Sequence, residues 1–187
     1  MLGVCVSFCV DCRFKVDEYF SSMDMKDHSL ATVATYFEQG VFAGILKYES
    51  VIRWADRVIL QDPEPLLEII DISFARSEAE ILLGCKSLGA DTKHVLAGKL
   101  LFSKLLSEVE EFPDRVEEIC SKGIHIAINF EIDDIVYFEL MGVAEELEYI
   151  RLKTSDAGFV QDSVLSLQAI LSRYAVHLEN SGLDIEE

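Results

Sequence analysis

Apolar residues at helical spacing constrain this chain more than any other feature. From Ser29 onward they recur at i, i+3, i+4 and i+7, as they do between Val51 and Ile59, so each segment has one apolar face. Only three prolines interrupt the 187 residues. The pattern predicts a mainly α protein: a compact antiparallel bundle or array of about six to nine helices, with residues 1–187 as one domain.

Capping and turn residues suggest where these helices begin and end. Ser29 is expected to cap a helix that runs to about Gln39 and stops at Gly40. A second helix is expected to end before Asp62-Pro63, because the residue before proline avoids the helical conformation. The other expected helix starts are Pro65, a capping box of Ser77 and Glu80, Asp91, and Pro113.

Three long apolar stripes are predicted to face the core in the second half of the chain. Between the first two, the helix that starts at Pro113 is predicted to place Val116, Ile119 and Cys120 inward. The stripes consist of Val95, Leu96, Leu100, Leu105, Leu106 and Val109; of Val136, Leu140, Val143, Ala144, Leu147 and Ile150; and of Val160, Val164, Leu167, Leu171, Ala175 and Leu178.

Two segments alternate between apolar and other residues, as β-strands do. Residues 124–132 fit a strand, but they also fit a helix, and the helical segments on both sides favour the helix. Residues 1–17 predict a small strand or hairpin. At the other end, residues 180–187 form an acidic tail.

The net charge limits the partners of this chain. It is −18, from 16 Lys and Arg against 34 Asp and Glu. Such a surface repels nucleic-acid phosphates and anionic lipids, so neither nucleic acid nor a membrane is an expected partner, whereas a basic protein is. No apolar run approaches the ~20 residues that span a bilayer. The odd number of cysteines, five, fits reduced thiols, so a cytoplasmic location is predicted.

The acidic excess is concentrated in the second half. Residues 1–94 hold 15 acidic and 9 basic side chains (−6), and residues 95–187 hold 19 and 7 (−12). A solvated helix face is the ordinary explanation of such runs, but these blocks have few of the interspersed cations that such faces carry. We therefore predict a partner-binding surface made of Glu108, Glu110, Glu111, Asp114, Glu117, Glu118, Asp133, Asp134, Glu145, Glu146 and Glu148.

The sequence contains no convincing catalytic, cofactor or metal motif, so we predict a protein that is not an enzyme and needs no cofactor. The spacing of Cys5, Cys9 and Cys12 is that of radical-SAM iron–sulfur ligands, but the βα units that accompany such a site are missing, and small buried thiols are the preferred interpretation. The four histidines show no zinc spacing. Asp133-Asp134 is interpreted as a helix cap rather than a metal site.

Residues 40–59 and 65–73 resemble a known family pattern. It consists of a glycine, a short turn, a helix ending in Trp-Ala-Asp, here Trp54 to Asp56, and a proline-initiated helix ending in Leu/Ile-Ser. The pattern is similar to that of small helical immunity proteins of bacterial contact-dependent growth-inhibition and polymorphic-toxin systems. In physical terms, Trp54 is expected to be a core anchor, Asp56 a polar group at a helix end, and Pro65 a helix starter.

The resemblance implies a protein that binds a toxin domain, often a basic nuclease, and blocks its active site or substrate groove. Our hypothesis is therefore a cytoplasmic immunity protein that binds one cognate basic toxin domain with its acidic blocks, one to one. An acidic helical scaffold or adaptor without a toxin partner is the main alternative. An iron–sulfur enzyme using Cys5, Cys9 and Cys12 is a further one.

Overall fold

A computed structural model describes residues 30–89, 95–130, 132–153 and 157–176 of the chain. The predicted strand or hairpin at 1–17, the acidic tail at 180–187, and the capping residues Ser29 and Asp91 lie outside the described residues, as do Cys5, Cys9, Cys12 and Leu178.

The described residues are mainly α-helical and include no β-strand, which confirms the predicted fold class. The helices are α2 (Leu30–Phe42), α3 (Tyr48–Gln61), α4 (Leu67–Phe74), α5 (Glu78–Gly89), α6 (Val95–Glu111), α7 (Val116–Phe130), α8 (Asp134–Lys153) and α9 (Ala157–Tyr174), with a 3-10 turn η1 at Pro113–Arg115.

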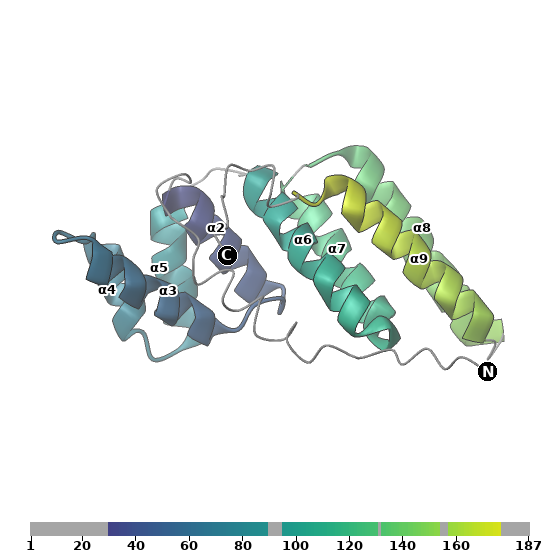
Figure 1. Cartoon of the computed structure of the whole chain (residues 1–187), viewed down its shortest axis with the longest axis horizontal. Helices are drawn as coiled ribbons and strands as arrows, with labels where there is room; N and C mark the ends of the chain where they lie inside the picture. The colour runs from purple at the N-terminus through teal and green to yellow at the C-terminus, as the bar shows by residue number, and fades with distance from the viewer. Residues whose placement is uncertain (1–29, 90–94, 131, 154–156, 177–187) are drawn as a thin grey trace, which may run out of the picture.

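The helices are arranged in two groups along the long axis of the molecule (Figure 1). In the first group α2 packs on α5, α5 on α4, and α4 on α3. In the second, α6, α7, α8 and α9 form an up-and-down bundle in which α6 contacts both α7 and α9. The contact of α2 with α6 joins the two groups. At this junction a Cβ added to Gly40 would lie 2.5 Å from a side-chain atom of Leu46 and 3.0 Å from one of Leu101, so the helices meet closely there.

Trp54 is buried in the first group, as predicted for a core anchor. Its ring centroid lies 5.1 Å from that of Phe37, so α3 packs on α2 through aromatic side chains. Asp56 differs from the prediction. It lies in the middle of α3 rather than at a helix end, and its carboxylate accepts a hydrogen bond from the hydroxyl of Ser73 on α4.

Two helix limits also differ from the prediction. The first helix does not stop at Gly40 but continues to Phe42, and Gly44 is the residue with a left-handed backbone (φ 66°), which glycine adopts without steric cost. Pro65 precedes α4 by two residues instead of starting it. The helix over 51–59 ends before Asp62-Pro63 as predicted.

Local capping follows the sequence closely. The Ser77 hydroxyl accepts the Glu80 backbone N–H at 3.3 Å, and the Glu80 carboxylate accepts the Arg76 N–H at 2.7 Å, so the predicted box forms with Arg76 in place of Ser77 as the second donor. Residues 124–130 are helical and belong to α7, as favoured.

In the second group, α6 buries residues on more of its surface than predicted, whereas the buried residues of α8 agree with the prediction. On α6, Val95 is exposed, while Ala97, Gly98, Leu101 and Phe102 join the buried set. Helices on several sides cover α6, because it contacts α2, α7 and α9. Five of the six α8 residues predicted to face the core are buried, and Ala144 is half-buried. Val116, Ile119 and Cys120 are buried on α7, as predicted.

Gly98 provides a test of this packing. A Cβ added there would lie 2.7 Å from Cγ of Phe130, so we expect Gly98→Ala to destabilise the protein by about 1–3 kcal/mol through overpacking, despite the higher helix propensity of alanine. Gly142 on α8 is the matched control. A Cβ there meets nothing within 4 Å, so Gly142→Ala should stabilise the protein by up to about 1 kcal/mol. Urea unfolding measures both, and equal effects of the two substitutions would contradict the close α6–α7 contact.

Candidate functional site

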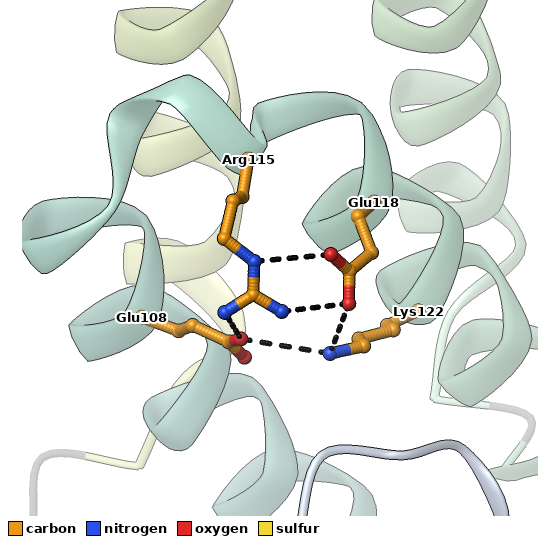
Figure 2. Close-up of polar contacts among 4 residues, drawn as sticks. All are labelled: Glu108, Arg115, Glu118 and Lys122. Carbon is orange, nitrogen blue, oxygen red and sulfur yellow. Dashed lines mark hydrogen bonds and ion pairs between the residues drawn. The ribbon is translucent and has the colours of Figure 1, made fainter.

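An ion-pair network lies where α6 turns into α7 (Figure 2). Arg115 of η1 donates two hydrogen bonds to the Glu118 carboxylate, from Nε at 3.0 Å and from Nη2 at 2.7 Å. Its Nη1 lies 3.1 Å from Oε1 of Glu108 on α6. Lys122 Nζ lies 2.9 Å from the Glu118 carboxylate and 3.5 Å from that of Glu108. Two cations thus neutralise two carboxylates at this turn, and Lys122 is a partner that the sequence analysis missed.

Hydrogen bonding to the ionised form dominates the acid–base properties of this network. The bonds from Arg115 and then from Lys122 lower the pKa of Glu118 to about 2. The bond to Glu118 likewise raises the pKa of Arg115. Glu118 is therefore ionised and paired, and Glu108 lies between the same two cations, so neither carboxylate contributes much to any attraction for a basic partner.

The remaining acidic residues of the first block are exposed around the same turn. Glu110 and Glu111 lie at the end of α6 and Asp114 lies in η1. Glu117 is exposed at the start of α7, with its Oε1 4.0 Å from Nη1 of Arg151 near the end of α8. Because Arg151 belongs to α8, this contact places the start of α7 beside the end of α8.

The second predicted block divides between the two ends of α8. Glu145, Glu146 and Glu148 are exposed toward its C-terminal end, and the antiparallel packing of α7 and α8 places them at the end of the bundle that holds the α6–α7 turn. Asp133 and Asp134 lie at the start of α8, at the opposite end of the bundle. The 15 residues of α7 span about 22 Å between these two ends. The structure therefore does not bring all the predicted residues together.

Asp133 has a structural role that the sequence predicted. Its Oδ1 accepts the backbone N–H of Ile135 at 2.9 Å, which caps the first turn of α8. We name the remaining exposed residues at the α6–α7 end the acidic end surface; it comprises Glu110, Glu111, Asp114, Glu117, Glu145, Glu146 and Glu148.

The two described cysteines are packing residues. Cys85 and Cys120 are both buried, and the Cys120 thiol donates to the Leu140 carbonyl at 3.3 Å between sulfur and oxygen. Burial raises the pKa of Cys120 to about 11 and that of Cys85 to about 12. Among the described residues no group of three or more His, Cys, Asp and Glu side chains is placed to hold a metal ion. Nor is any helix in the described ranges both long and apolar enough to cross a membrane.

Apolar side chains on the outer face of α8 are the feature that sequence analysis overlooked. Ile135, Phe138, Tyr149 and Leu152 are between 56 and 72% exposed, although α8 buries a full apolar stripe on its other side. The helical spacing of these four residues is present in the sequence. It was not noticed because the buried stripe of α8 already accounts for a helix there.

Comparison with protein-family models, with curated proteins and with solved structures gives no match. The resemblance of residues 40–59 and 65–73 to immunity proteins therefore stays a prediction from those residues.

The network at the α6–α7 turn gives a pH-dependent prediction. The pKa of Glu118 in the folded protein lies below its ordinary value of 4.5, so its contribution to stability is present above pH 4.5 and is lost as the pH falls toward 2. We expect Glu118→Gln to destabilise the protein by less than about 1 kcal/mol at neutral pH, since the pair is exposed. The difference from the unmodified protein should vanish near pH 2.

Urea unfolding across this pH range measures the effect. Glu110→Gln is the matched control, because Glu110 is exposed on the same turn of the bundle and makes no ion pair with a described residue. A loss of stability on Glu118→Gln that is the same at all pH values would contradict the assigned role.

The buried thiols give a second prediction. Because only the thiolate reacts and both pKa values are raised, Cys85 and Cys120 should resist iodoacetamide in the folded protein near pH 8 and react once urea unfolds it. Peptide mass spectrometry distinguishes these two sites from the others. Rapid modification of either under native conditions would show that it is not a packing residue.

Proposed function

We propose that this chain is an immunity protein that binds one cognate basic toxin domain, such as a nuclease, and covers its active site or substrate groove with the acidic end surface. The observation that carries the proposal is that seven exposed carboxylates, from the end of α6, η1, the start of α7 and the C-terminal half of α8, lie in the half of the bundle that holds the α6–α7 turn. Exposed carboxylates resemble the phosphates of a nucleic acid in charge, and lysine and arginine side chains that bind phosphate also bind carboxylate.

The cations near this surface are largely engaged within the protein. Arg115 and Lys122 pair with Glu108 and Glu118, and Arg151 lies near Glu117. The acidic side chains of this surface repel one another and lower stability, a cost that a basic partner would relieve on binding. Long-range attraction of this kind also accelerates association and weakens steeply with salt.

The proposal supplements the sequence resemblance of residues 40–59 and 65–73 to immunity proteins. We expect the reading frame immediately upstream to encode a large secreted protein with a basic, nuclease-like C-terminal domain. Production of that domain alone should stop bacterial growth, and co-production of this chain should restore it. A toxic domain that this chain fails to neutralise would refute the assignment.

Charge reversal tests the surface itself. The reversed set avoids Glu118, because its network contributes to folding. We expect simultaneous replacement by lysine to weaken binding of the toxin domain at least about tenfold, to slow association and to reduce its salt dependence. The four residues replaced are Glu110, Glu145, Glu146 and Glu148.

A matched reversal in the first helix group separates the surface from bulk charge. It also replaces four exposed acids by lysine, and so changes the net charge equally, but it should leave binding within about twofold. Its residues are Glu49, Glu64, Asp71 and Glu78. Circular dichroism and urea unfolding confirm that both variants fold. Equal weakening by the two variants would indicate that only the net charge matters, as an acidic scaffold without a dedicated toxin interface predicts.

A further inference from the structure

The outer face of α8 carries exposed apolar side chains on a regularly spaced row of positions. Its exposed positions follow one another at intervals of three and four residues, on the side away from the buried Val136, Leu140, Val143 and Leu147. We name them the α8 stripe; they are Ile135, Phe138, Gly142, Glu145, Tyr149 and Leu152.

This arrangement is unusual for a surface helix. A helix on the outside of a bundle normally has polar residues on its solvent side, and one that is apolar on both sides is normally covered on both. Among the described helices α8 packs on α7 and α9, which lie on its buried side. Figure 1 shows α8 at the edge of the molecule farthest from α2–α5. Four of the six stripe positions thus carry large apolar side chains in an exposed place.

The spacing fits a helical partner. Alternating intervals of three and four residues over the length of a helix form the seam into which a second helix inserts its own side chains. Gly142 lies near the middle of the stripe, and a Cβ added there would meet nothing within 4 Å. Neither internal packing nor a positive φ requires a glycine at this position, and its bare backbone leaves room for a bulky side chain of a partner helix.

Charge determines the chemistry of that partner. Glu145 lies within the stripe, and Glu146 and Glu148 flank it. From Asp134 to Lys153 the helix holds five acidic side chains and two basic ones, and Arg151 already lies near Glu117. A partner helix with apolar residues at the seam and lysine or arginine beside it would satisfy both the apolar and the acidic residues.

A second copy of this chain and the chain's own terminal segments fit the α8 stripe less well. The stripe positions are symmetric about their centre, so an antiparallel second copy would align Ile135 with Leu152. That register would place the Glu145 side chains of the two copies within about one helical turn of each other and Glu148 opposite Glu139, where like charges repel. The terminal sequences of this chain do not supply basic charge either. Residues 1–29 hold five acidic and three basic side chains, and residues 177–187 hold four acidic and none basic.

From these observations we infer that the outer face of α8 docks a basic amphipathic helix of a partner protein, with apolar residues of that helix packed on the α8 stripe and its cations on Glu145, Glu146 and Glu148. The inference rests on the proposed function only for the identity of the partner as a toxin domain. The prediction that a basic amphipathic helix binds here depends only on the α8 stripe and the glutamates beside it.

The test uses the full chain and a labelled synthetic peptide of about three heptads, with leucine at the a and d positions and lysine at e and g. Fluorescence anisotropy at physiological ionic strength should show binding of this peptide. Two comparison peptides, one with glutamate in place of lysine and one with the same composition in scrambled order, should bind at least about tenfold more weakly.

Two double variants locate the peptide. Phe138→Ser with Leu152→Ser should weaken binding of the lysine peptide at least about tenfold. Leu60→Ser with Leu83→Ser removes two comparably exposed apolar side chains from α3 and α5 and should leave binding within about twofold. Circular dichroism verifies that both fold.

Three results would overturn the inference: equal binding of the scrambled peptide, which indicates charge attraction alone; equal weakening by both double variants; and a dimer of the unmodified chain in sedimentation that the stripe variant dissociates.

The toxin domain separates this inference from the proposed function. If Phe138→Ser with Leu152→Ser leaves the binding of both the lysine peptide and the toxin domain intact while reversal of the acidic end surface abolishes toxin binding, the helix-docking inference fails and the immunity function stands. If the lysine peptide docks as expected and no toxin is neutralised, the helix-docking inference stands and the immunity function fails.

Discussion

The burial of α6 on several sides is the constraint on which the rest of the structure depends. Leu100, Leu101 and Phe102 are consecutive and all buried, and three successive residues point in directions about 100° apart on a helix. Such burial requires neighbours on more than one side, which α2, α7 and α9 provide. Without α6 the contact that joins the two helix groups would be lost, and the faces of α2, α7 and α9 that pack on it would be exposed.

The same packing determines which carboxylates face a partner. Where α6 turns into α7, Glu108 and Glu118 meet Arg115 and Lys122 and become part of the fold. The acidic end surface lies around this network and is held by helices that pack on α6 or on its neighbours. A rigid support of this kind keeps like charges close together, where a flexible segment would let them separate, and this supports the proposed attraction for a basic partner.

The helix α8 connects the two proposals. One side of it belongs to the core of the bundle, while the other carries the α8 stripe and three carboxylates of the acidic end surface. Charge by itself gives fast but weakly specific association, whereas apolar contacts at defined spacing give orientation and a slow dissociation. An inhibitor that must find one partner and remain bound to it benefits from both on a single rigid helix.

The sequence by itself determined the features that depend on neighbours in the chain. The helical class, the Ser77–Glu80 box, the Asp133 cap and the buried stripe of α8 all follow from residues within one or two helical turns of each other. Tertiary structure decided the rest. Lys122 pairs with Glu108 only because α6 and α7 pack as they do, and Asp56 meets Ser73 only because α3 lies against α4.

The position of the acidic residues divides in the same way. Their number and their excess over cations are properties of the sequence, but their division between two ends of the bundle follows from the direction of each helix. An apolar spacing predicts that a helix buries one face without specifying what covers the other, so the outer side of α8 became visible as an exposed stripe only when its neighbours were in place.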